Sequence, residues 1–112
     1  MARRDARALV RRAHARRLCA GHFPGDPLLP GAYLAGLMAD LAERLIAARG
    51  GRAAELSEVV RCVFLDRVRP DDEIVVAARL DATRGGRTSV ETKVLIGERC
   101  AARATLRFGA RR

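Results

Sequence analysis

Aromatic residues are scarce in this chain of 112 residues, and tryptophan is absent. Aromatic residues make up 4% of the sequence, whereas hydrophobic residues of all kinds make up 49%. A chain of this length and composition can bury a modest hydrophobic core but is too short to divide into two domains. We therefore expect one domain over residues 1–112, with a core built from aliphatic side chains.

Long apolar runs are also lacking. No stretch approaches the ~20 consecutive apolar residues that a membrane-spanning helix needs. The first residues, "MARRDARALVRRAHARR", are basic, but they lack the apolar segment and cleavage site of a secretory signal. We therefore expect no membrane association and a cytoplasmic location.

Cysteine is sparse and follows no recognisable pattern. Cys19, Cys62 and Cys100 are odd in number and widely spaced, so a disulfide framework is not expected. Together with His14 and His22, they match no zinc-binding spacing, which disfavours a metal site. We expect free thiols in a reducing compartment, and a solvated or structural role for His14.

The charge is strongly of one sign and is carried by arginine. Lysine and arginine total 22 against 13 acidic residues, which gives a net charge of +9, and Lys93 is the only lysine. The basic residues lack the interleaved aromatic residues of a single-strand-binding protein, which disfavours nucleic acid as the partner. A nucleic-acid-binding module stays as a rival interpretation, and it requires an affinity that falls steeply with salt. An acidic carrier protein is the other candidate that a positive surface would attract.

One helical segment is evident after Pro30. Apolar residues recur at i, i+3 and i+4 from Tyr33 to Leu45, with small residues between them. Proline suits the start of a helix, where its missing N–H costs nothing, and Gly50–Gly51 suits the end. The segment is apolar on most sides, so we expect one long helix that is buried.

Four later segments alternate apolar and polar residues, as half-buried antiparallel strands do. They cover residues 58–68, 72–82, 87–97 and 99–109. Tight turns are expected at Gly85–Gly86 and at Gly97–Glu98. Residues 6–20 indicate a short strand followed by a loop, although their alanines and arginines also suit a helix.

These elements predict an α+β domain in which one long central helix is wrapped by an antiparallel sheet. A single sheet of this kind leaves an edge strand exposed. Because an exposed edge presents unpaired N–H and C=O groups, it favours pairing with a second copy.

Three stretches carry a resemblance to a known family: "GHFPGDPLLPG" (residues 21–31), "VFLDRVRPDDEI" (residues 63–74) and "VLIGERCAARATLRF" (residues 94–108). The chain resembles the hot-dog-fold 3-hydroxyacyl-acyl-carrier-protein dehydratases of fatty-acid synthesis and their relatives in polyene and polyketide pathways. The resemblance implies a dimeric hot-dog fold and removal of water from a 3-hydroxyacyl thioester. The substrate would be carried on the phosphopantetheine of acyl carrier protein, without a metal or redox cofactor.

The resemblance assigns His22 as the base that takes the C2 proton and the Gly31 backbone N–H as the donor to the thioester carbonyl. An unperturbed pKa near ~6.5 suits a histidine to this task. The first turn of a helix presents free N–H groups to a developing negative charge. Tyr33 could donate a hydrogen bond in the pocket or simply pack the helix, and Phe23 would anchor the loop. The residues expected around the substrate are Phe23, Pro30, Tyr33 and Gly36.

The family's helix carboxylate is missing. It follows the histidine by fourteen positions, and Gly36 stands there. Asp40, one turn later, could substitute, or it could be a surface residue that takes part in an ion pair. A partner subunit in a heterodimer could instead supply the carboxylate, whereas a homodimer would lack it. The remaining alternatives are an inactive subunit that binds acyl chains or serves as a scaffold, and a hot-dog thioesterase; some thioesterases also use a helix carboxylate, which disfavours the latter.

Overall fold

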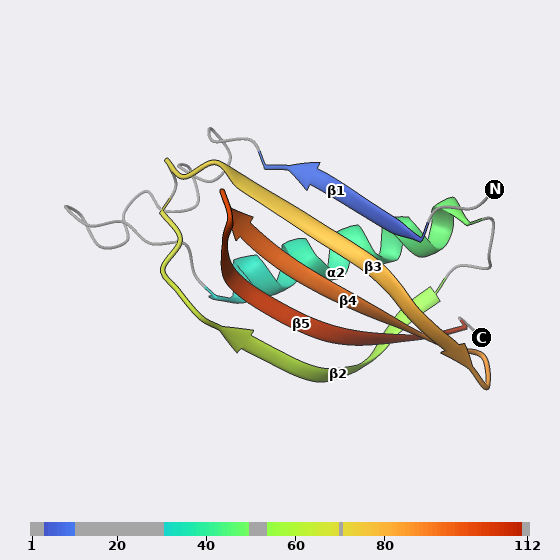
Figure 1. Cartoon of the computed structure of the whole chain (residues 1–112). Coiled ribbons are helices and arrows are strands. Elements are labelled where there is room, and N and C mark those ends of the chain that lie inside the picture. Colours follow the sequence, from blue (N-terminus) through green and yellow to red (C-terminus); the bar gives the residue numbers. More distant parts are fainter. Residues whose placement is uncertain (1–3, 11–30, 50–53, 70, 111–112) are drawn as a thin grey trace.

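The computed structural model describes residues 4–10, 31–49, 54–69 and 71–110. One helix lies against a five-stranded antiparallel sheet with the order β1-β3-β4-β5-β2 (Figure 1). This arrangement confirms the predicted α+β architecture. The elements are β1 (Asp5–Leu9), α2 (Gly31–Ala48), β2 (Ala54–Phe64), β3 (Ile74–Arg84), β4 (Arg87–Ile96) and β5 (Arg99–Ala110).

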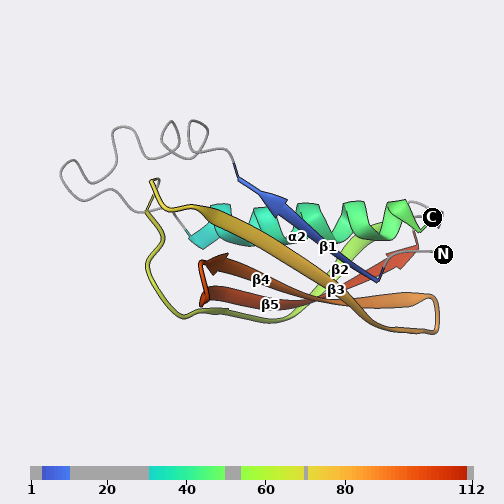
Figure 2. The ribbon, with the colours of Figure 1, turned by 45° about the horizontal axis from the view of Figure 1, so that its top comes forward.

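Helix α2 packs one face on the sheet and leaves the other face exposed. Figure 2 shows the helix and the sheet as two layers. The expectation of a helix buried on most sides was therefore wrong, because the single sheet of one chain covers only one face. Among the described residues of α2, Gly36, Asp40 and Glu43 are exposed. The buried residues of α2 are Leu34, Met38, Leu41, Ala42, Leu45 and Ile46.

The two predicted turns are confirmed as tight hairpins. Gly85 and Gly86 have φ values of 56° and 77°, and Gly97 has a φ of 61°. Positive φ at such positions is favourable for glycine and matches the right-handed twist of the joined strands. The short strand expected within residues 6–20 is present as β1, which begins one residue earlier than that segment.

Strand β2 differs from its prediction over residues 58–68. It begins earlier, at Ala54, and ends at Phe64. After Phe64 the chain leaves the sheet, and Val68 is buried in the core rather than placed on a strand. The apolar and polar alternation continues past the point where sheet pairing stops.

The core lies between α2 and the sheet. Among the described residues it is aliphatic apart from Met38 and Phe108, as expected from the scarcity of aromatic residues. The buried Thr92 hydroxyl donates to the Ala104 carbonyl at 2.9 Å, so its polar group is satisfied. No helix in the described ranges is long and apolar enough to cross a membrane.

Candidate active site

The start of α2 meets the end of β2. Gly31 is the first residue of the helix, and the Phe64 ring lies against it. A Cβ on residue 31 would lie 3.1 Å from the ring Cζ, so a side chain could fit only if the ring moved. Glycine therefore lets an aromatic wall approach the helix terminus, where backbone N–H groups lack intrahelical partners.

The backbone after Phe64 is fastened to β5. The N–H groups of Leu65 and Asp66 both donate to the Ala101 carbonyl, at 2.8 and 3.1 Å. The Asp66 carboxylate also contacts Arg99 at 2.7 Å. Because these bonds tie the end of β2 to its neighbour, they fix the position of the Phe64 ring beside the helix.

Strand β2 carries an apolar row on its helix-facing side. Val59 is 52% exposed and Phe64 51% exposed, although both face the side of the sheet where α2 lies. The helix covers this edge only in part. The Phe64 ring touches Gly31 and Cys62 packs against the core, while about half of Val59 and of Phe64 stays exposed. The register places Leu56 opposite Phe108, Val59 opposite Leu106, Cys62 opposite Ala104 and Phe64 opposite Ala102, all buried on β5.

Gly36 lies on the exposed face of α2. Apart from its chain neighbours and the adjoining helix backbone, no atom of the described residues lies within 4 Å of the position that a Cβ would take there. A larger side chain would therefore project into open space. The packing of the described residues gives no steric reason for glycine at the position where the family carries its carboxylate.

Tyr33 and Asp40 lie on the side of α2 that faces β1. Together with Leu9 they line a cavity of about 200 Å³ between the helix and that strand. Tyr33 is half-buried, and its hydroxyl oxygen is buried. The side chain of Asp40 is 59% exposed and contacts Arg44 at 3.1 Å. The structure thus places these two residues away from the contact between the helix start and β2.

The remaining predicted site residues, His22, Phe23 and Pro30, lie outside the described residues, as does His14. Within the described ranges, no cluster of three or more His, Cys, Asp or Glu side chains could hold a metal ion. The roles assigned to these residues and the expectation of no cofactor stay predictions.

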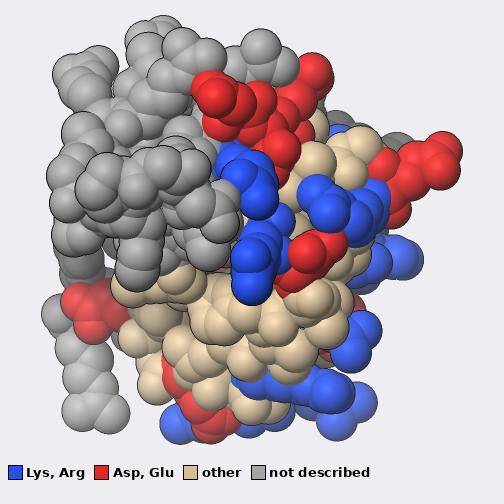
Figure 3. Space-filling model, turned by 90° about the vertical axis from the view of Figure 1, so that its left-hand side faces the viewer, with Lys and Arg blue, Asp and Glu red and all other residues tan. Residues whose placement is uncertain are grey.

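Two features of the site went unnoticed in the sequence. The first is the contact between Gly31 and Phe64, which joins residues far apart along the chain. The second is the exposed apolar row of β2, for which the adjacent Val59 and Val60 were an available signal. Figure 3 looks onto the end of the molecule where α2 begins, and shows a tan surface with both basic and acidic side chains around it.

Comparison with known proteins identifies relatives of the chain. The sequence model of the ApeI-like family, described as ApeI dehydratase, matches residues 3–102. The 3-hydroxyacyl-[acyl-carrier-protein] dehydratase FabZ of Alkaliphilus metalliredigens is 30% identical over 91 residues. The match covers 79% of this chain and 62% of that protein. The chain thus spans about three fifths of the length of the curated relatives that it matches.

Two solved structures share the fold. Protein smu.793 from Streptococcus mutans UA159, solved bound to acetyl CoA, matches with a TM-score of 0.79 and 15% identity, over 99% of this chain and 86% of that one. The dehydratase heterocomplex ApeI:P from Xenorhabdus doucetiae matches with a TM-score of 0.71 and 18% identity, over 96% and 88%. These likenesses confirm the hot-dog fold.

Proposed function

The chain belongs to the ApeI-like dehydratase family, and from this premise we propose that it takes part in dehydrating 3-hydroxyacyl thioesters carried on acyl carrier protein. His22 removes the C2 proton, and the Gly31 N–H stabilises the negative charge that builds on the thioester oxygen. The C3–O bond then breaks, the hydroxyl takes a proton from an acid and leaves as water, and a trans-2-enoyl thioester remains. Each step is a proton transfer or the C–O cleavage that follows it, so the proposal needs no metal or redox cofactor.

The observation that carries the proposal is the contact between Gly31 and Phe64. It places a helix N-terminus, a natural donor site for a developing oxyanion, beside an aromatic ring and the exposed apolar row of β2. A donor next to apolar surface suits a thioester carbonyl that is followed by an acyl chain. His22 precedes Gly31 in the same "GHFPGDPLLPG" stretch.

The missing acid comes from a second subunit in this proposal. A partner that pairs along β2 would cover the apolar row of that strand and bring its own helix beside α2. If the partner is a different, carboxylate-bearing dehydratase subunit, its carboxylate completes a site with His22 of this chain. The reciprocal site, which faces Gly36, lacks an acid.

A second candidate function is a subunit without turnover of its own, which binds the acyl chain or serves as a scaffold for an active partner. The absence of a side chain at Gly36 and the ion pair that occupies Asp40 favour it. In this candidate, His22 contributes nothing to the rate of the complex.

Acyl carrier protein is the proposed carrier of the substrate. Arg61 and Arg67 are exposed, three residues before and three residues after Phe64 along the chain. Basic side chains at the rim of an interface steer an acidic partner and raise its association rate. Charge reversal at Arg67 should therefore lower kcat/KM more at low salt than at high salt.

Turnover of 3-hydroxyacyl carrier protein, followed by intact mass, tests the proposal. The chain is assayed alone and with dehydratase subunits encoded beside it in the genome. We expect little turnover alone and a gain of at least a hundredfold with a carboxylate-bearing partner. His22→Ala should abolish that gain. If the mixed complex loses nothing on His22→Ala, the scaffold candidate replaces the catalytic one.

A further inference from the structure

The hairpin between β3 and β4 places two arginines face to face. Arg84 and Arg87 are the last paired residues before the Gly85–Gly86 turn, and they lie directly opposite each other in the register. Figure 1 shows this hairpin at the far end of the molecule from the start of α2. The hairpin is therefore remote from Gly31, and a role for it need not depend on the proposed dehydration.

A third arginine lies nearby on the same face of the sheet. Ser89 follows Arg87 by two residues on β4, and Arg107 of β5 lies opposite Ser89. A cavity of about 230 Å³ is lined by Ala82, Arg84, Arg87, Ser89 and Arg107. The lining therefore includes three arginines and one serine, and none of the five residues is acidic.

The positive charge of this cavity is only partly balanced. Arg107 contacts the Glu58 carboxylate at 3.2 Å, whereas Arg84 and Arg87 form no ion pair with any described residue. Like charges directly opposite each other on neighbouring strands destabilise the pairing. A bound anion would remove this repulsion, so the hairpin is better suited to an occupied cavity than to an empty one.

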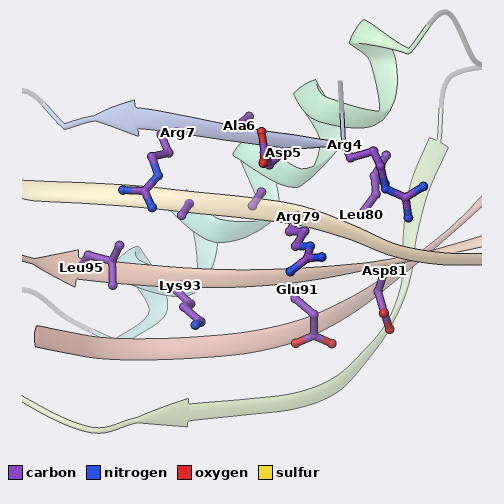
Figure 4. A pocket seen from close by; sticks show the side chains of 12 residues that line it. Arg4, Asp5, Ala6, Arg7, Arg79, Leu80, Asp81, Glu91, Lys93 and Leu95 are labelled. Carbon is purple, nitrogen blue, oxygen red and sulfur yellow. The ribbon is translucent and has the colours of Figure 1, made fainter. Parts of the chain in front are cut away.

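The larger hollow on the same face of the sheet offers a contrast. Figure 4 shows its lining, in which acidic and basic side chains alternate. Arg79 lies opposite Asp5 on one side and Glu91 on the other. The positive charge of Arg79 is therefore flanked by a carboxylate on each neighbouring strand. By contrast, the charged residues that line the cavity at the β3–β4 hairpin are all basic.

We propose that the cavity lined by Arg84, Arg87, Ser89 and Arg107 binds a tetrahedral oxyanion, namely a phosphate group. Guanidinium groups donate paired N–H bonds that match the spacing of phosphate oxygens. The Ser89 hydroxyl supplies a further donor. Carboxylates bind less well, because a planar group with two oxygens can engage fewer of the four side chains at once.

Titration of the full-length, isotope-labelled chain with inorganic phosphate tests this site by NMR. Ionic strength is held constant with sodium chloride. We expect saturable shifts of the Gly86 and Ser89 amides, and an at least tenfold weaker affinity in Arg87→Gln. The matched control is Arg79→Gln, which removes one positive charge from the same face of the sheet and should change the affinity less than twofold.

Arg84→Glu separates binding from folding. It replaces the like-charge pair by an opposite-charge pair, so the Tm should stay equal or rise while the response to phosphate disappears. Adenosine 3′,5′-bisphosphate, compared with inorganic phosphate, identifies the source of the group: tighter binding indicates an organic monoester, equal binding the free ion, and both support the site. Shifts that grow linearly without saturation, or equal losses in Arg87→Gln and Arg79→Gln, overturn the proposal.

Discussion

Three ring carbons of Phe64 lie between 3.1 and 3.3 Å from the position that a Cβ on Gly31 would occupy. Ordinary carbon contacts are longer, at about 3.5–4.0 Å, so the ring touches the helix backbone directly only because residue 31 has no side chain. The contact couples the first turn of α2 to the end of β2, and thus the proposed oxyanion donor to the strand at the edge of the sheet.

Gly31→Ala should lower activity far more than stability. The added methyl group pushes the Phe64 ring away by a few tenths of an ångström and disturbs the approach of the thioester to the N–H. We expect kcat/KM to fall at least tenfold in the active complex. The free energy of unfolding should change by less than about 1 kcal/mol, because alanine's better helix propensity offsets part of the crowding. Urea unfolding and the turnover assay measure the two effects.

The double variant Gly31→Ala/Phe64→Leu tests the cause of that loss. Leucine is smaller than phenylalanine and would leave room for the methyl group, so the two substitutions should be strongly non-additive, as expected of residues in contact. Activity should recover in part. A double variant whose losses simply add would show that the ring contact is not the reason for glycine.

Gly36→Glu should give this chain dehydratase activity in the absence of a different dehydratase subunit. The position opens into free space, so the side chain fits, and glutamate is also the better helix former by about 0.5 kcal/mol. We expect turnover of the chain alone to rise at least a hundredfold. The matched control, Gly36→Gln, has nearly the same shape but no carboxylate. Equal gains in both variants would mean that helix stability, rather than proton transfer, limits the rate.

Asp40→Asn distinguishes a substitute acid from a surface residue. The carboxylate is 59% exposed and pairs with Arg44, and an exposed i,i+4 pair contributes only about 0.3–0.5 kcal/mol. We expect the free energy of unfolding to fall by no more than that amount, and turnover in the complex to change less than twofold. A loss of tenfold or more at unchanged stability would assign Asp40 the role of the acid.

Val59→Lys should prevent association along β2. A lysine in the apolar row places a charge where a partner would bury the strand, and an edge lysine is a common guard against strand pairing. Sedimentation should show the monomer at concentrations where the unaltered chain associates. Leu9→Lys is the matched control, since Leu9 is 65% exposed on the opposite edge strand. If both variants lower association equally, or neither does, β2 is not the interface.

Local signals in the sequence were sufficient for most of the fold. The helix from Gly31 follows from apolar periodicity, and the hairpins follow from glycines that tolerate positive φ. The end of β2 could not be inferred, because the alternation continues after Phe64. What stops the strand is a long-range arrangement, in which two successive N–H groups share the Ala101 carbonyl.

The alternation of apolar and polar residues also could not predict which face of the sheet each β2 side chain lies on. Register shifts occur between Leu56 and Glu58 and between Val59 and Arg61. Each shift inserts an unpaired residue and exchanges the faces of those that follow. Strict alternation from Leu56 would turn Val59 away from the helix, yet the observed pairing turns it toward the helix. The contact of Phe64 with Gly31 likewise depends on tertiary packing that no local pattern encodes.

The two edges of the sheet are unequal, and this bears on the proposed pairing along β2. Strand β1 is five residues long with one exposed large apolar side chain, Leu9, whereas β2 is eleven residues long and bears the exposed apolar row. A sheet in which both edge strands could pair with another copy could assemble into an open-ended filament. When only one edge can pair, the first association buries that edge and leaves none for a further copy. If the chain pairs through β2, as proposed above, that pairing therefore ends at two chains.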